Sequence, residues 1–186
     1  MDTCGMRLGI AEHLGWAIAV TASGDHEVVD RRRIELVEPG MSAAPIHYES
    51  RRLDVAATAA LVAKVRASVV RATSAALDEI ATALPAPVLS ISLRAWPPDF
   101  PDDIAVQRHA PYEARADAIM YRQELSELAH ARDWEVHLYD AKAVVGQAAR
   151  MLAERADEVL QGPRATIGPP WTKDHRIALA ATIVAG

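Results

Sequence analysis

The first part of the chain contains three short stretches, one directly after another, in which residues alternate as they do in β-strands. In the second stretch Trp16, Ile18 and Val20 fall on one face and alanines on the other, which is the period of two that a strand requires. Gly24 marks a turn before the third stretch, because glycine adopts positive φ without steric cost. The stretches are Arg7–Glu12, Trp16–Val20 and Glu27–Val37. They predict an antiparallel three-stranded meander at the start of a chain that then turns helical.

The third of these stretches is strongly charged. It carries Asp30, Glu35 and the run Arg31–Arg33 among β-branched residues. Such charges suit a strand at the edge of a sheet, where they discourage pairing with other chains. We interpret the arginine run as a solvated edge, and a phosphate-binding patch is the alternative.

Helical and strand patterns alternate through the rest of the chain. The longest predicted helix, Leu53–Leu84, is rich in alanine and ends before Pro85. Its basic residues Lys64 and Arg71 suggest a solvated face or a nucleic-acid contact. Its predicted apolar stripe consists of Leu61, Val65, Val69, Ala72, Ala76 and Ile80. The other predicted elements are strands Val88–Leu93 and Trp134–Tyr139 and helices Tyr112–Arg132, Ala141–Leu160 and Lys173–Ala185.

This order of elements predicts an α/β fold. A meander followed by alternating helices and strands gives one mixed five-stranded sheet with helices on both faces. The right-handed crossover rule makes the later strands parallel to the first. The length of 186 residues suits a single domain spanning residues 1–186.

Composition narrows the environment and the possible partners. The formal net charge of −5 argues against a protein covered in nucleic acid, although a local basic patch can coexist with an acidic total. Cys4 is the single cysteine, so no intramolecular disulfide can form and no cysteine-based zinc site exists. We therefore expect a cytoplasmic location. The sequence shows neither a signal peptide nor an apolar run long enough to span a membrane.

The order of elements and three local stretches resemble the ribonuclease H-like superfamily, and most of all its RuvC-like branch of Holliday junction resolvases. Leu8–Glu12 with Gly15–Ala17 looks like the family's opening glycine-isoleucine-aspartate strand and hairpin. Val136–Tyr139 with Ala143–Ala148 looks like its late strand and valine-glycine helix start. Lys173–Ala180 is similar to its closing helix. Together these stretches span nearly the whole chain.

The resemblance implies a nuclease centre whose acids are largely replaced here. In the family, three or four carboxylates hold two divalent ions, which activate water for phosphodiester cleavage. Ala11 occupies the first-strand aspartate position, and the neighbouring Glu12 would point to the opposite face. The central strand ends at Arg94 without an acid, and Ile177 occupies the closing-helix aspartate position. Asp174, one turn earlier, matches an auxiliary acidic position.

The leading hypothesis is a catalytically degenerate ribonuclease H-like domain that binds nucleic acid or a protein partner and needs no cofactor. Its candidate residues come from strand ends and the closing helix, which converge at one sheet edge. The tryptophans among them stand beside prolines and are expected to be exposed partner contacts or packed loop anchors. The candidates are Glu12, His13, Arg94, Trp96, Trp171, Lys173, Asp174 and His175.

Two further hypotheses are open. One is a divergent nuclease that uses Mg²⁺ or Mn²⁺, with Glu12, Asp174 and His175 as catalytic residues. Its metal ligands would be Glu12, Asp140 and Asp174, although Asp140 also suits a helix N-cap. The other is a structural homodimer that pairs through the alanine-rich face of Leu53–Leu84.

Overall fold

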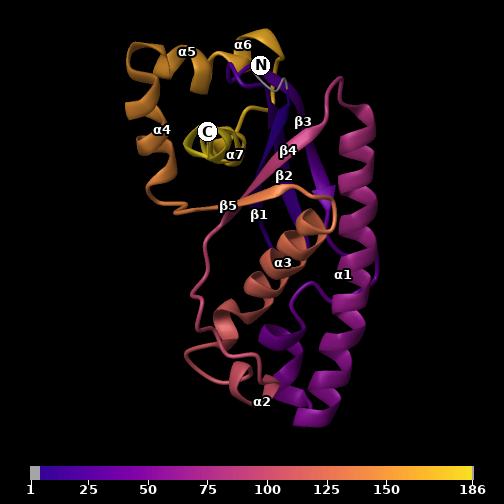
Figure 1. The fold of residues 1–186 in the computed structure, drawn as a ribbon. Coiled ribbons are helices and arrows are strands. Elements are labelled where there is room, and N and C mark those ends of the chain that lie inside the picture. The colour runs from indigo at the N-terminus through magenta and orange to yellow at the C-terminus, as the bar shows by residue number, and fades with distance from the viewer. Residues whose placement is uncertain (1–4, 186) are drawn as a thin grey trace.

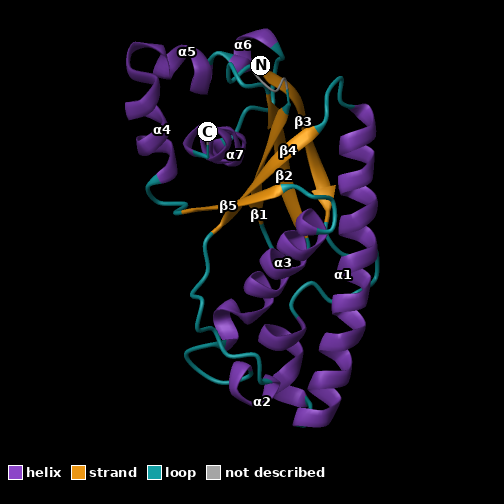
Figure 2. Cartoon of the chain, in the orientation of Figure 1, coloured by secondary structure: helices purple, strands orange, loops and turns teal. Residues whose placement is uncertain are grey.

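A computed structural model describes residues 5–185, and Cys4 lies outside this range. The strands form one mixed five-stranded sheet in the order β3-β2-β1-β4-β5 (Figures 1 and 2). They are β1 Met6–Glu12, β2 Trp16–Ala22, β3 Val28–Glu35, β4 Val88–Arg94 and β5 Glu135–Tyr139. The first three strands are antiparallel neighbours, β4 runs parallel to β1, and β5 runs parallel to β4. The predicted mixed sheet is therefore confirmed, with β3 at one edge.

The helices cover both faces of this sheet (Figure 1). α1 and α3 lie on one face, while α7 lies on the other and packs against α4. The helices are α1 Val55–Ala83, α2 Ile104–Gln107, α3 Glu113–His130, α4 Val144–Leu152, α5 Ala156–Gln161, α6 Pro163–Thr166 and α7 Lys173–Val184. A π-helical turn at Pro45–Glu49 and 3₁₀ turns at Ser50–Arg52 and Ala153–Arg155 complete the list. Within residues 5–185, no helix is both long and apolar enough to cross a bilayer.

Strand alternation divides the interior into two cores. Leu8 and Ile10 of β1 pack with α1 and α3, whereas Ala11 packs with α7. In β2, Ala17 and Ala19 face α1 and α3, and Ile18 and Val20 face α7, as the alternation predicts. β1 needs a glycine at Gly9, because a Cβ there would overlap the carbonyl oxygen of Ala178 in α7.

The buried face of α1 is only partly the predicted one. Val65, Val69 and Ile80 are buried, but Leu61, Ala72 and Ala76 are only half-buried. The buried face also includes Thr58, Val62, Ser68, Thr73 and Leu77. Polar residues are buried there because the chain satisfies them: the hydroxyl of Ser68 accepts the N–H of Glu38 at 3.0 Å. Apolar periodicity cannot detect such positions.

The predicted helix Ala141–Leu160 is broken in the structure. α4 ends at Leu152, Ala153 has a φ of 50°, and the chain turns sharply into α5 (Figure 1). The turn brings Val159 and Leu160 of α5 into the same core as α7. Tertiary packing has therefore overridden a continuous helical pattern. The short helix α6 lies between the predicted helices Ala141–Leu160 and Lys173–Ala185, where no helix is predicted.

Candidate functional site: a cationic cleft at the strand ends

The C-terminal ends of three parallel strands lie side by side at one end of the sheet. β1, β4 and β5 run parallel, and their last residues are Glu12, Arg94 and Tyr139. Tyr139 is buried and its hydroxyl donates to the carbonyl of Ile10 at 2.6 Å. Burial raises the pKa of Tyr139, so this phenol stays protonated as a structural donor.

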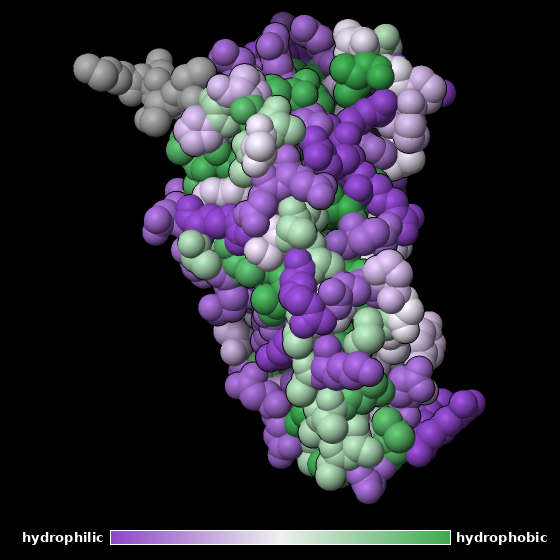
Figure 3. Space-filling view, turned by 90° about the vertical axis from the view of Figure 1, so that its right-hand side faces the viewer, coloured by the Kyte–Doolittle hydropathy of each residue, from purple (hydrophilic) through white to green (hydrophobic). Residues whose placement is uncertain are grey.

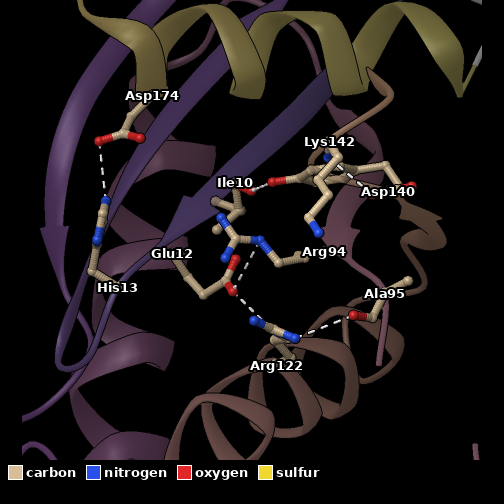
Figure 4. A network of polar contacts seen from close by, with 10 residues as sticks. Ile10, Glu12, His13, Arg94, Ala95, Arg122, Asp140, Lys142 and Asp174 are labelled. Atoms are coloured by element: carbon tan, nitrogen blue, oxygen red, sulfur yellow. Dashed lines mark hydrogen bonds and ion pairs between the residues drawn. The ribbon is translucent and has the colours of Figure 1, made fainter. Parts of the chain in front are cut away.

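Glu12 is a buried counter-ion for two arginines at this edge (Figure 4). Its side chain is only 2% exposed. The Nε of Arg122, on α3, donates to the Glu12 Oε1 at 2.6 Å, and the Nε of Arg94 lies 3.7 Å from the same oxygen. Arg122 also donates to the carbonyl of Ala95 at 3.1 Å. Separating such a pair would leave a buried charge without compensation. The Glu12 carboxylate is therefore held in place by the arginines.

The strand ends open into a cleft of about 410 Å³, which we call the cationic cleft. Its lining includes three cationic side chains, of Arg94, Lys142 and Lys173, and one acid, Asp140. Both lysines are exposed, and Figure 4 shows Lys142 on the Arg94 side of the cluster. The carboxylate of Asp140 accepts the backbone N–H of Lys142 at 2.8 Å, in the turn that leads into α4. Asp140 therefore shapes the turn. The prediction that it caps the helix is corrected, because α4 begins later and its N-cap is Ala143.

The positions that hold metal-binding acids in the resembled family are apolar or cationic here. Ala11 is 1% exposed and Ile177 is 5% exposed, and both belong to the core around α7. Arg94 is the last residue of β4, the strand next to the central strand β1. Divalent ions such as Mg²⁺ take oxygen ligands, which a methyl, an aliphatic chain and a guanidinium cannot supply. The residues present do not fit the two-metal centre of the family.

The alternative metal set Glu12, Asp140 and Asp174 is not assembled. Glu12 binds arginines, Asp140 holds its turn, and Asp174 accepts from His13, whose Nε2 lies 3.0 Å from the Asp174 Oδ2. Among residues 5–185, no group of three or more histidine, cysteine or acidic side chains could hold a metal ion. The predicted ligand set is therefore corrected: these acids occupy three separate environments.

His175 serves the start of α7. It is 5% exposed, and its Nδ1 accepts the backbone N–H of Thr172 at 3.2 Å and pairs with the Thr172 hydroxyl at 2.8 Å. A backbone N–H can only donate, so this nitrogen carries no proton. Burial, reinforced by the charge of Arg31, lowers the pKa of His175. The side chain is a neutral helix cap, a role that the sequence did not predict for it.

The two candidate tryptophans are loop anchors to different degrees. Trp171 is 9% exposed, and its indole N–H donates to the carbonyl of Leu160 at 2.8 Å. The expectation of an exposed partner contact is therefore wrong for Trp171, because its apolar ring is needed to attach α5 to α7. Trp96 is half-buried against the core on the α1 and α3 side.

The arginines of β3 bind their own chain. Arg31 donates to the carbonyls of Ile167, Pro169 and Pro170. Arg32 pairs with Asp30 at 2.7 Å. Arg33 pairs with Glu35 at 2.9 Å, and its guanidinium lies 4.1 Å from the ring centre of Trp16, on which His13 also stacks. These intramolecular partners do not support the phosphate-patch alternative.

The sequence reasoning missed two residues of the site. Lys142 follows the end of β5, so the rule that parallel strands end at one edge could have placed it there. Arg122 carried no such signal. It meets Glu12 only through a contact between residues 110 positions apart.

The predicted dimer face of α1 is exposed. Figure 3 faces this side of the molecule and shows hydrophobic atoms, greenest toward the lower part, interrupted by hydrophilic side chains. Exposed residues along the helix include Val55, Ala56, Ala60, Ala63 and Ala67. The homodimer stays a prediction, which a molar mass in solution tests.

Comparison with known proteins places the fold. No family model matches the chain, and no curated protein matches it. Among solved structures, T. thermophilus RuvC in complex with a Holliday junction substrate matches with a TM-score of 0.53 and 11% identity. The match covers 97% of this chain and 91% of that one. The likeness shows the fold: an α/β, ribonuclease H-like architecture of the RuvC type.

Proposed function

We propose that this RuvC-like, ribonuclease H-like domain binds nucleic acid through its phosphates, at the cationic cleft, and does not cleave it. One observation carries the proposal. Where the family resemblance implies carboxylates and two divalent ions, this chain gathers Arg94, Lys142 and Lys173. Arg94 stands at a position where the resemblance implies a metal-binding acid, and the two lysines line the same cleft.

The charge distribution supports a local binding site. The whole chain carries a formal charge of −5, which repels a polyanion. Within the cleft three cations face one acid. Glu12 compensates only part of the charge of Arg94 and Arg122, because one carboxylate serves two guanidinium groups. A phosphate backbone would therefore be attracted to this edge of the sheet rather than to the molecule as a whole.

The same charges oppose metal-dependent hydrolysis. Cleavage by this fold type depends on ions that activate water and stabilise the leaving oxygen. Near Arg94, Lys142 and Lys173 a divalent cation would be repelled rather than held. Binding without cleavage is what remains for these residues.

The test is fluorescence anisotropy of a labelled oligonucleotide between 50 and 200 mM salt. With about three phosphates neutralised, affinity is expected to fall roughly 20-fold for a single strand and roughly 40-fold for a duplex over that range. The double variant Lys142→Glu, Lys173→Glu is expected to abolish binding. The control variant Lys64→Glu, Arg150→Glu makes the same charge change at exposed positions of α1 and α4 outside the cleft. We expect this control to retain most of the binding.

Two results would contradict the proposal. One is an affinity that does not weaken as salt rises, because phosphate contacts release counterions. The other is an equal loss in the cleft variant and in the control, which would make binding a property of net charge. Absence of any binding would also overturn the proposal. Of the leading hypothesis, only binding of a protein partner would then remain.

A further inference from the structure

The cationic cleft continues into a second hollow along α7. This groove, of about 550 Å³, shares Ala141, Lys142, Lys173 and Ile177 with the cleft. It adds Val145, Gln161 and Arg176 to the lining, and no acid lines it. The two hollows therefore form one path, which runs from the strand ends along the side of α7 next to the start of α4.

The cations along this path are of two kinds. Lys142 and Lys173 are exposed at the rim. Arg94 has a side chain 34% exposed, and Arg176 is half-buried, with its Nη1 donating to the Oε1 of Gln161 at 3.3 Å. In the described part of the chain, the ion pairs found include none made by Lys142, Lys173 or Arg176. A ligand that contacts all four cations has to follow the whole path, whereas the two lysines are the most accessible from outside.

We propose that the path takes a single-stranded segment of nucleic acid, whose phosphates contact Arg94 in the cationic cleft and Arg176 in the groove as well as the two lysines. This inference rests on the proposed function. A single strand is flexible enough to follow this path and contact the less exposed arginines, whereas a double helix is stiff and should contact mainly the exposed lysines. The apolar wall of Val145 and Ile177 suits the sugars and base edges that accompany the phosphates.

The groove also predicts how the strand is recognised. Single-strand binders usually add aromatic side chains on which bases stack. Tyr139 is the one aromatic residue in the lining of this path, and it is buried with its hydroxyl bonded. Affinity should therefore come mainly from phosphate contacts, with strong salt dependence and little sequence preference.

The experiment compares a labelled single strand with a blunt duplex of the same sequence by anisotropy, across a series of salt concentrations. Four contacts predict a slope of log affinity against log salt of about −2.8 for the single strand. Arg176→Gln should make that slope shallower by about 0.7 and leave duplex binding unchanged. Lys173→Gln, at the rim, should weaken both. Circular dichroism melting shows that each variant is folded.

The outcomes separate this inference from the proposed function. Duplex bound as tightly as the single strand, or an equal effect of Arg176→Gln on both, overturns the single-strand inference and leaves phosphate binding standing. If Arg176→Gln does not fold, Arg94→Gln repeats the comparison at the other inner cation. Binding of neither probe overturns both proposals.

Discussion

Two regions of this molecule are rich in positive charge, and they use it in opposite ways. On β3, Arg31 holds loop carbonyls, and Arg32 and Arg33 pair with acids two residues away. In the cationic cleft, Lys142 and Lys173 are exposed and face a single acid. The arginine run is the more conspicuous in the sequence, yet its charges stabilise the fold. The scattered lysines are exposed and, among the residues described, make no ion pair that would compensate their charge.

The difference teaches that formal charge and available charge are separate quantities. A cation attracts phosphate strongly only when its own chain leaves it uncompensated. On β3, acids compensate Arg32 and Arg33 and carbonyls bind Arg31, whereas in the cleft Glu12 compensates the positive charge only in part. The following predictions test this contrast, from the largest expected effect to the smallest.

The largest effect is expected from Glu12→Gln. It removes the carboxylate that two guanidinium groups share, and leaves their charges buried or half-buried. We expect a loss of about 3 kcal/mol in the free energy of unfolding, measured by urea denaturation. The remaining folded protein should bind nucleic acid more tightly, because the cleft has gained positive charge.

Glu35→Gln is the matched control for that prediction. It breaks the exposed pair with Arg33, and should cost less than about 1 kcal/mol. Equal costs for the two variants would mean that the Glu12 cluster is no more constrained than a surface ion pair.

The second effect compares the two regions directly. Lys142→Gln with Lys173→Gln, and Arg32→Gln with Arg33→Gln, each remove two positive charges. The cleft pair should reduce the salt dependence of nucleic-acid binding by about two phosphate contacts, whereas the β3 pair should leave it unchanged. Anisotropy titrations in a salt series measure this. A shared loss would show that the β3 arginines also reach phosphate.

The third effect concerns acid sensitivity. Burial, together with the charge of Arg31, holds the pKa of His175 below its ordinary value of 6.5, and burial also lowers the pKa of His26. Below that pH the unfolded chain binds more protons than the folded one. Stability should therefore fall as the pH is lowered below 6.5, and thermal melts in a pH series should show it.

Arg31→Gln sharpens this prediction. Without the guanidinium, the pKa of His175 should rise toward its ordinary value, while burial still lowers it. An NMR titration of the imidazole measures the change. An unchanged pKa would show that the β3 arginine does not act on the helix cap.

The smallest effect is expected from metal ions. An ion that bound only the folded state would stabilise it by mass action and raise the melting temperature. Millimolar Mn²⁺ should not do so, because no metal-binding group is found among residues 5–185. Asp174→Asn, which alters the contact with His13, should respond to Mn²⁺ as the wild type does. A rise that disappears in this variant would restore the carboxylate centre as a hypothesis.

Much of the fold could be predicted because its signals are local. The alternation of Trp16, Ile18 and Val20 identified β2 and its two faces, and the β3 charges placed that strand at an edge. The candidate site was predicted in part. The sheet edge and Arg94 were anticipated, but the metal set was not assembled, and Arg122 was missed.

The sequence by itself determined the order of the strands and main helices, the mixed sheet, and the presence of Ala11, Arg94 and Ile177 where the family resemblance implies acids. These depend on the period of two or 3.6 residues and on residue identity, which a linear chain displays directly. Only the tertiary structure decided that α4 breaks at Ala153 and that Glu12 meets Arg122 across 110 positions. It also decided which cations are compensated. The reason is physical: a charge is compensated, or an apolar face covered, by whichever residues folding brings near, and sequence separation does not limit that choice.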